Sequence, residues 1–221
     1  MCGVFGFVSR GNRPINLGIL KQIARVTQRR GRDAWGMAWI DGRGRMHSFK
    51  QTGPVADHIG LLAMAHDARV LIGHCRFATR GDADNNLNNH PHPADGGWIV
   101  HNGVIRNYDS MLQRFQLWPT GDCDSEVLGL LIEQVEGTLL ERCIDAVCAV
   151  EQSPLVLLGL WKPGTLIAVR QDNPLHVGKT GRGFYLASLA DGLPGRVSEL
   201  PNNQAVEFGE EIKHGQTNSL V

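Results

Sequence analysis

Cys2-Gly3-Val4-Phe5-Gly6 is the stretch around which the rest of this sequence is interpreted. Residues 3–9 are mostly apolar, so we expect a buried strand that holds Cys2 inside the fold. Removal of Met1 would leave a thiol and a free α-amine on one residue. The thiolate is the nucleophilic form of cysteine, and an amine of pKa about 7.7–8.0 can serve as its base. Cys2 is therefore a candidate nucleophile; the alternative is a small buried core residue.

The composition is that of an ordinary globular protein. Of the 221 residues, 42% are hydrophobic and 20% are charged, which are typical proportions. The 22 basic and 22 acidic side chains balance, so there is no electrostatic reason to expect a nucleic-acid partner. No apolar run is long enough to cross a bilayer, and no basic stretch precedes the N-terminal apolar segment. Five cysteines without a C-x-x-C pair favour a reducing compartment, so we expect a cytoplasmic protein with no membrane partner.

The spacing of apolar residues predicts a layered arrangement of helices and strands. Helices are expected at 16–28, 55–66, 108–117, 125–134 and 139–150. Strands are expected at 3–9, 35–40, 46–51, 70–77, 98–101, 154–161, 165–170, 175–178, 184–188 and 205–208. The polar segment 79–97 is long enough to be a binding loop. This order predicts an α+β fold with antiparallel sheets, forming one domain over residues 1–221, with a boundary near Glu151 as the alternative.

Three further groups of polar residues could form a site together with Cys2. They are Gly73-His74-Cys75-Arg76-Phe77-Ala78-Thr79-Arg80-Gly81; Asn88-Asn89-His90-Pro91-His92 with Val100-His101-Asn102-Gly103; and Asp122-Cys123-Asp124-Ser125-Glu126-Val127. Each has a simpler interpretation. Asn102-Gly103 is a strong hairpin-turn signal, Arg76 at a strand end is typical of a surface charge, and Asp124 before an apolar run is typical of a helix N-cap.

Four histidines in these groups, His74, His90, His92 and His101, could also form a metal site. The His-x-His spacing of two of them is common by chance, however. No acidic-His helix motif accompanies it. We therefore expect neither a metal nor a cofactor.

Taken together, the groups supply what cleavage of an amide requires. A thiolate that attacks an amide carbonyl creates an oxyanion, which is stabilised by preorganised donors such as the Asn102 amide and the Gly103 N–H. An α-amino acid substrate also needs a cation for its carboxylate and an anion for its ammonium. Arg76 can grip a carboxylate through two hydrogen bonds, Asp124 can pair with an ammonium, and Thr79 adds a hydroxyl.

These motifs resemble a known family. The chain is similar to the glutaminase domains of class II, N-terminal nucleophile glutamine amidotransferases, such as those of glucosamine-6-phosphate synthase and amidophosphoribosyltransferase. The following segments occur in the order of that family: Cys2-Gly3-Val4-Phe5-Gly6, Arg30-Gly31-Arg32-Asp33, Gly73-His74-Cys75-Arg76-Phe77-Ala78-Thr79, Asn89-His90-Pro91-His92, His101-Asn102-Gly103 and Asp124-Ser125-Glu126. The resemblance extends from Cys2 to about Phe208.

The resemblance implies a four-layer αββα sandwich in which Cys2 is the nucleophile. It also implies that Asn102 and Gly103 form the oxyanion hole. The residues that would hold glutamine are Arg76 on the carboxylate, Asp124 on the amino group, Thr79 and Gly103. Two positions depart from members similar to glucosamine-6-phosphate synthase, which have Trp in place of Phe77 and His in place of Arg80. Both positions shape the floor and the covering loop of the glutamine pocket.

The implied reaction is hydrolysis of glutamine to glutamate and ammonia through a thioester on Cys2. Family enzymes usually continue into a synthase domain that consumes the ammonia, whereas this sequence stops at Val221. We expect either a separate synthase subunit that receives the ammonia or simple amide hydrolysis. Two alternatives are hydrolysis of another γ-glutamyl amide and a catalytically idle regulatory module of the same fold.

Overall fold

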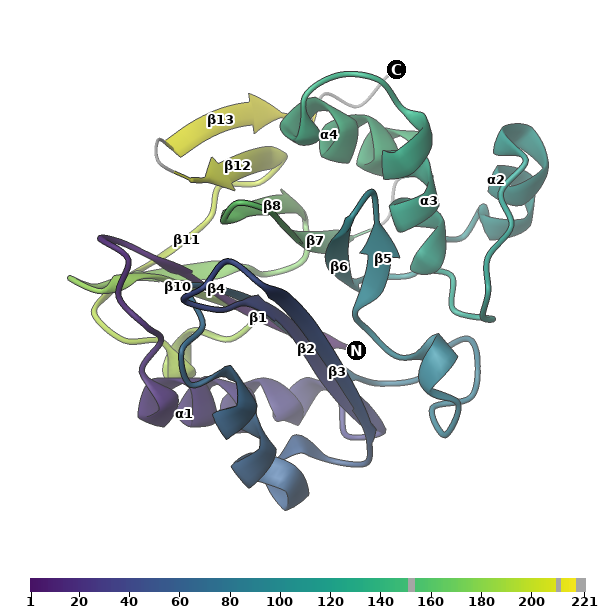
Figure 1. Cartoon of the computed structure of the whole chain (residues 1–221). Helices are drawn as coiled ribbons and strands as arrows, with labels where there is room; N and C mark the ends of the chain where they lie inside the picture. Colours follow the sequence, from purple (N-terminus) through teal and green to yellow (C-terminus); the bar gives the residue numbers. More distant parts are fainter. Residues whose placement is uncertain (151–153, 210–211, 218–221) are drawn as a thin grey trace.

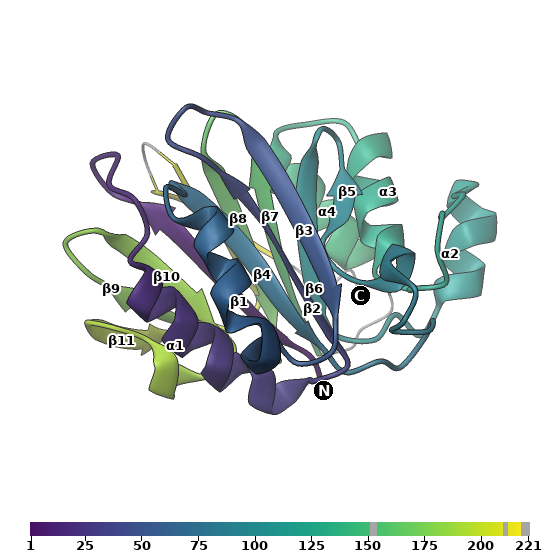
Figure 2. The same ribbon diagram turned by 60° about the horizontal axis from the view of Figure 1, so that its bottom comes forward.

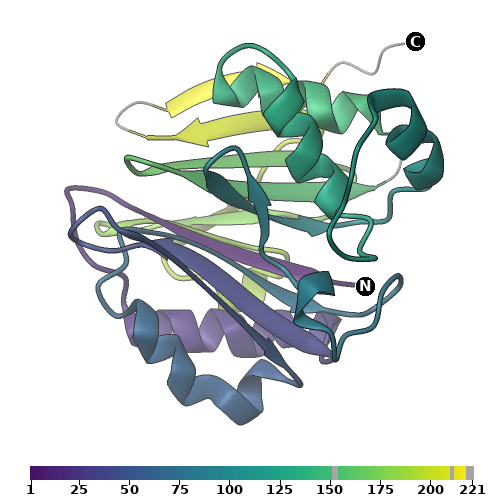
Figure 3. The same ribbon diagram turned by 45° about the vertical axis from the view of Figure 1, so that its right-hand side comes forward.

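Two antiparallel sheets packed face to face form the centre of the protein, and helices cover both outer faces (Figure 1). The structure is a computed structural model that describes residues 1–150, 154–209 and 212–217. The layers run helix, sheet, sheet, helix, which Figure 3 shows from the side. The α+β class and the four-layer αββα sandwich are therefore confirmed. The alternative domain boundary near Glu151 falls on residues 151–153, which lie outside the described residues.

The first sheet has seven strands in the order β11-β9-β10-β1-β4-β2-β3. Their bounds are β1 Gly3–Ser9, β2 Ala34–Ile40, β3 Met46–Thr52, β4 Val70–Arg76, β9 His176–Lys179, β10 Gly183–Ala187 and β11 Arg196–Glu199. β1 lies in the middle, between β10 and β4, because almost all its side chains are apolar and both its faces are buried. The N-terminal strand predicted from Gly3 to Ser9 is thus confirmed.

The second sheet has six strands in the order β13-β12-β8-β7-β6-β5. Their bounds are β5 His92–Ala94, β6 Gly97–Asn102, β7 Leu155–Trp161, β8 Thr165–Gln171, β12 Gln204–Phe208 and β13 Ile212–Gln216. β6 pairs directly with β7, although three helices separate them in the sequence. Residues 102 and 156 are therefore neighbours at one end of this sheet.

Helices cover the outer face of each sheet (Figures 1 and 2). α1 (Leu17–Thr27) and the 3₁₀ segment η2 (Val55–Ala65) cover the first sheet, whereas α3 (Glu126–Gln134) and α4 (Leu139–Ala149) cover the second. α2 (Tyr108–Phe115) lies to one side of them. Short 3₁₀ turns complete the described elements: η1 Gln28–Arg30, η3 Asn86–Asn88 and η4 Ala190–Gly192. No helix in the described ranges combines the length and the apolar character that a membrane crossing requires.

Three hydrophobic cores hold the layers together, one between the sheets and one under each helical layer. Phe5 and Val4, adjacent in β1, point into different cores because side chains alternate along a strand. Phe5 packs over Gly73 of β4, where a Cβ atom would lie 2.2 Å from the Phe5 ring. A glycine is therefore required at position 73 for β1 and β4 to pair around that ring.

The structure corrects several sequence-based assignments. The helix expected at 55–66 is a 3₁₀ segment with a kink at His58, where φ is −118° and ψ is 21°. Gly60 within the segment weakens a regular α-helix there. Strands β5, β11 and β13 were not predicted: β5 is a three-residue edge strand containing Pro93, and all four residues of β11 are exposed. Neither β5 nor β11 shows the alternation of apolar and polar residues by which strands are recognised in a sequence.

Candidate functional site

Cys2 lies immediately before β1, half-buried, with its thiol against the backbone of Phe77. The Phe77 N–H donates to Cys2 Sγ over 3.3 Å, and the thiol donates to the Phe77 carbonyl oxygen, also over 3.3 Å. The pairing of Gly3 with Cys75 brings Cys2 to the end of β4, and the thiol contacts the first residue after that strand. The N-terminus lies between the two sheets, on the side of the molecule that carries α2 (Figure 3).

Arg30 holds the backbone of the candidate nucleophile. Its Nε donates to the carbonyl oxygen of Cys2 over 2.7 Å. The next residue, Gly31, packs so tightly on Arg76 that a Cβ atom there would lie 2.3 Å from the Arg76 carbonyl carbon. The Arg30–Asp33 motif gives no sign of this role in the sequence alone. The segment anchors Cys2 and the end of β4 together.

Burial raises the pKa of the Cys2 thiol above its ordinary value. The Phe77 N–H, the N-terminal charge and the Arg76 guanidinium lower this pKa, whereas the Asp124 carboxylate raises it further. The net direction is upward, so the thiol is protonated at neutral pH and needs a base to become nucleophilic. The charges of Arg76 and Asp124 both act on Cys2, so the fold brings these three predicted residues to one site.

Asn102 ends β6 and is only 2% exposed. Its backbone carbonyl accepts a hydrogen bond of 2.9 Å from Asn173 Nδ2, which also donates to the Pro154 carbonyl. Its own side-chain nitrogen Nδ2 is buried and has no hydrogen-bond partner among the described residues. A buried N–H without a partner is costly and rare, so it marks a place where a ligand acceptor is expected.

The hairpin-turn interpretation of Asn102-Gly103 is wrong. A hairpin turn at Asn102-Gly103 would be followed at once by a strand that pairs with β6. The partners of β6 are instead β5, which precedes it, and β7, which begins more than fifty residues later. The tight turn of this region is Asp95-Gly96, with φ of 46° and 70°, which joins β5 to β6. Gly103 is a glycine for steric reasons instead: a Cβ atom there would lie 2.5 Å from His101 Nε2.

Arg76, at the end of β4, is not a surface charge, since it is only 2% exposed. Nη1 donates to Asn89 Oδ1 over 2.8 Å and to the Asp82 carbonyl over 3.3 Å. Nη2 donates to the carbonyl oxygens of Arg80 (2.5 Å) and Gly81 (2.8 Å). Both terminal nitrogens of the guanidinium are therefore occupied by the loop that follows β4.

Phe77 and Thr79 lie on this loop and are exposed, Phe77 to 49%. The loop is attached to α2 through Arg80, whose guanidinium carbon lies 3.9 Å from the centre of the Tyr108 ring. Such a contact between a cation and an aromatic face contributes about 0.5–1 kcal/mol at an exposed site. Phe77 contacts Cys2 through its backbone, whereas no contact of the exposed Thr79 side chain with another site residue is seen among the described residues.

Asp124 is buried at the start of α3, but it does not cap that helix. The N-cap position is Ser125, which makes no side-chain capping bond. The Asp124 carboxylate instead accepts a hydrogen bond of 2.7 Å from the Ile105 N–H through Oδ2. Asp124 thus joins α3 to the segment that follows Gly103, and this contact was not predictable from its helix-capping pattern.

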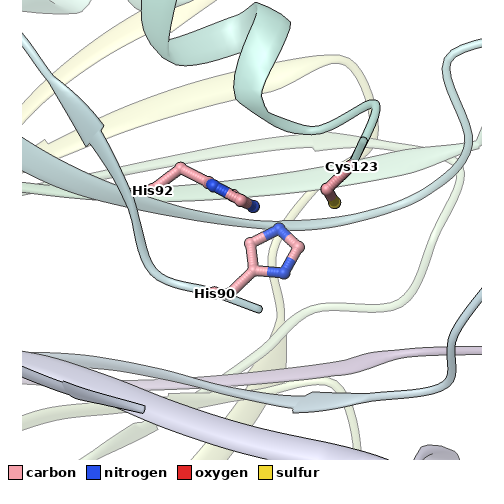
Figure 4. A group of neighbouring side chains, drawn as sticks. All are labelled: His90, His92 and Cys123. Carbon is pink, nitrogen blue, oxygen red and sulfur yellow. The ribbon is translucent and has the colours of Figure 1, made fainter. Parts of the chain in front are cut away.

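Behind these residues lie the four buried histidines His74, His90, His92 and His101. Burial is the main cause that lowers the pKa of all four, of His92 to about 3 and of His101 to about 4, so their rings are neutral. Cys123 joins two of them: ligand atoms of His90, His92 and Cys123 lie within 4.8 Å of one another (Figure 4). The four histidines were candidate metal ligands from the sequence, whereas the proximity of Cys123 to them is apparent only in the fold.

Comparison with known proteins gives one consistent family. The family described as "Glutamine amidotransferases class-II" matches residues 1–148. Glutamine–fructose-6-phosphate aminotransferase of Photorhabdus laumondii is 33% identical over 202 residues, which cover 85% of this chain and 32% of that protein. The enzyme of the same name from Aquifex aeolicus is 32% identical, over 88% of this chain and 33% of that protein. The chain thus spans about a third of the length of these relatives.

Solved structures share the fold. Glutamine phosphoribosylpyrophosphate amidotransferase from B. subtilis superimposes with a TM-score of 0.80 at 20% identity, covering 98% of this chain and 49% of that one. A glutamine aminotransferase class-II domain protein from Silicibacter pomeroyi gives a TM-score of 0.64 at 18% identity, covering 97% of this chain and 99% of that one. At these identities the likeness concerns the fold, and it agrees with the two-sheet sandwich described above.

Proposed function

The chain belongs to the class-II glutamine amidotransferases, and from this premise we propose that it hydrolyses the side-chain amide of glutamine at Cys2. The observation that carries the proposal is that one chain presents both a thiol fixed just before β1 and a buried Asn102 Nδ2 that has no hydrogen-bond partner among the described residues. A nucleophile and an oxyanion donor are the two parts that acyl transfer needs most.

The proposed reaction proceeds in two steps. The Cys2 thiol gives its proton to the Cys2 α-amine, directly or through a water, and the resulting thiolate adds to the glutamine δ-carbon. The carbonyl oxygen becomes an oxyanion held by Asn102 Nδ2 and the Gly103 N–H. Collapse of this intermediate breaks the C–N bond, and the protonated amine gives its proton to the leaving ammonia. Water then adds to the thioester at the same oxyanion site, and cleavage of the C–S bond releases glutamate and the thiol.

This route requires removal of Met1. While Met1 remains, the nitrogen of Cys2 is an amide and cannot accept the thiol proton at neutral pH. The thiol then stays protonated, because burial raises its pKa. The chain with Met1 retained should therefore be inactive, whereas the chain that begins at Cys2 carries its own base.

We also propose how glutamine is held. The substrate carboxylate replaces loop carbonyls on the Arg76 guanidinium, since a charged acceptor forms a stronger hydrogen bond than a neutral carbonyl. Asp124 pairs with the substrate ammonium through Oδ1, because Oδ2 accepts the short hydrogen bond from Ile105 whereas Oδ1 accepts only a 3.9 Å contact from the Cys123 thiol. Phe77 and Thr79, on the displaced loop, close the pocket over the bound substrate.

Residues 1–221 form, in this proposal, one glutaminase domain, supported by the pairing of β1 at one end of the chain with β10 near the other. The ammonia passes to a synthase partner in a separate subunit. This assignment is supported by the relatives, whose name records transfer of nitrogen from glutamine to a sugar phosphate. Co-purification from the native host, with ammonia transfer measured for the recovered complex, tests this part.

The experiment that tests the function measures glutamate formation by the purified chain, together with the mass of its N-terminus. We expect the protein that begins at Cys2 to release glutamate. The Cys2→Ala variant should keep the thermal stability of the unchanged chain but release no glutamate. Equal turnover by Cys2→Ala would overturn the nucleophile assignment. Parallel assays with larger γ-glutamyl amides distinguish glutamine from another substrate of this class, and retention of Met1 in an active preparation would refute the amine base.

A further inference from the structure

We propose that His90, His92 and Cys123 bind one zinc ion in the interior of the protein, between the two sides of the glutamine site. The three residues come from the segment before β5, from β5 itself and from the turn before α3. Their ligand atoms lie within 4.8 Å of one another, and all three side chains are buried. Figure 4 shows the two imidazole rings and the sulfur directed into the same space.

The separation of the three atoms is close to that of a zinc site. With Zn–N of about 2.0–2.1 Å and Zn–S of about 2.3 Å, tetrahedral geometry places neighbouring ligand atoms roughly 3.3–3.7 Å apart. On binding the ion, the three side chains would rotate toward one another to reach these distances. The backbone is already held, since a Cβ atom on Gly36 of β2 would lie 2.2 Å from the carbonyl oxygen of His90.

The ring nitrogens support a ligand at this place. Neither Nδ1 nor Nε2 of His90 has a hydrogen-bond partner among the described residues, and the same holds for Nε2 of His92. Three buried nitrogens without partners are a large cost for a polar cluster unless something outside the chain satisfies them. Because burial keeps both rings neutral, they are in the form that coordinates a metal.

The donor set selects the metal. A thiolate with two imidazoles suits zinc, whereas magnesium and calcium require oxygen ligands. The Cys123 thiol, whose pKa burial raises to about 11, loses its proton when it coordinates the cation. The fourth position of the tetrahedron is left to a small exogenous ligand such as water.

The position of the ion suggests a structural role. Cys123 precedes Asp124, which is proposed to bind the substrate ammonium, and His90 follows Asn89, which bonds to Arg76. A metal at this point would tie the Arg76 side of the site to the Asp124 side. It is not required for the chemistry at Cys2, so zinc binding and glutamine hydrolysis can be tested separately.

The test titrates the full-length chain, purified under reducing conditions and stripped of metal, with Co²⁺ and then with Zn²⁺. We expect each chain to bind one Co²⁺ ion and to show a thiolate-to-cobalt charge-transfer band. Addition of Zn²⁺ should abolish this band. Cys123→Ala should lose the band, and His92→Gln should weaken binding at least about 100-fold, since even residues that only orient metal ligands change affinity about 10–100-fold. Cys2→Ala should keep the band while losing glutaminase activity, which separates this proposal from the proposed function.

Cys148→Ser is the matched control, because it removes another cysteine outside the cluster. The control should bind Co²⁺ like the unchanged chain. If either ligand variant fails to fold, the unchanged chain still decides the question through a rise in its melting temperature on addition of one equivalent of Zn²⁺. Absence of stoichiometric Co²⁺ binding by the unchanged chain, or an unaltered band in Cys123→Ala, would overturn the site.

Discussion

Arg30 donates a hydrogen bond of 2.7 Å from its Nε to the backbone carbonyl of Cys2. The guanidinium is partly buried, and burial lowers its pKa below the usual value. It is therefore a fixed anchor on the very residue that is proposed to attack the substrate. The position of the thiol thus depends on the Arg30 side chain, which comes from the η1 turn after α1, as well as on the pairing of β1 with β4.

The first prediction concerns this anchor. Arg30→Met keeps much of the aliphatic stem but removes the hydrogen bond to Cys2, so kcat for glutamine should fall by about 10–100-fold, as expected for a displacement of the order of 1 Å. KM should change little, because Arg30 is not proposed to touch the substrate. Arg29→Ala is the control: Arg29 belongs to the same turn but forms an exposed ion pair with Asp191. An equal loss in both variants would contradict a specific anchoring role.

The second prediction concerns the oxyanion donor. Asn102→Ala removes the unpartnered Nδ2 and should lower kcat by about 10²–10³ with little change in KM, the usual cost of one such donor. Removal of this buried amide should not lower thermal stability by much, since it breaks no hydrogen bond made by that nitrogen within the described residues. Steady-state kinetics and a thermal melt of the same sample provide both readouts. A wild-type kcat in Asn102→Ala would mean that Asn102 is not an oxyanion donor and has only a structural role.

How far the sequence predicts the structure depends on whether a contact is local. The buried strand β1 follows from the mostly apolar residues 3–9, and its register with β4 then brings Cys2 to the end of β4, where its thiol contacts Phe77. Local statistics failed at Asn102-Gly103, because that pair leaves the end of β6 toward α2 and the turn is formed by Asp95-Gly96 instead.

Contacts between distant segments were the least predictable. The carbonyl oxygens that occupy Arg76 come from the path of a loop, and no side-chain pattern encodes them. Cys123 meets His90 and His92 only because α3 packs against β5, the edge strand of the second sheet. Such contacts depend on tertiary placement of polar residues, which hydrophobic periodicity does not describe.

The third prediction concerns the carboxylate site. Arg76→Lys keeps the charge but has neither the planar fork nor the reach to replace four hydrogen bonds to the loop. KM for glutamine should rise about 10–100-fold, consistent with loss of charge-assisted hydrogen bonds of about 1.5–3 kcal/mol. Arg25→Ala, an exposed position on α1, serves as the control. Unchanged KM in Arg76→Lys would mean that Arg76 only orders the loop.

The fourth prediction concerns stability and pH at Asp41, at the end of the sheet where β2 turns into β3. His47, the largest cause, and Arg45 lower the pKa of this carboxyl far below its ordinary value through hydrogen bonds of 3.0 and 2.9 Å. The folded protein therefore holds the ionised form more strongly than the unfolded chain does. This contribution is fully present above the ordinary Asp pKa of about 3.9 and is lost as the pH falls below it.

Asp41→Asn should thus lower the melting temperature at pH 7, and the difference from the unchanged chain should shrink as the pH is reduced toward about 3. Asp57→Asn is a suitable comparison, since that carboxylate takes no part in the described ion pairs. Thermal melts of the three proteins across this pH range measure the effect directly. A gap between Asp41→Asn and the unchanged chain that stays constant from pH 7 to pH 3 would show that the carboxyl stabilises the fold through packing alone, without its charge.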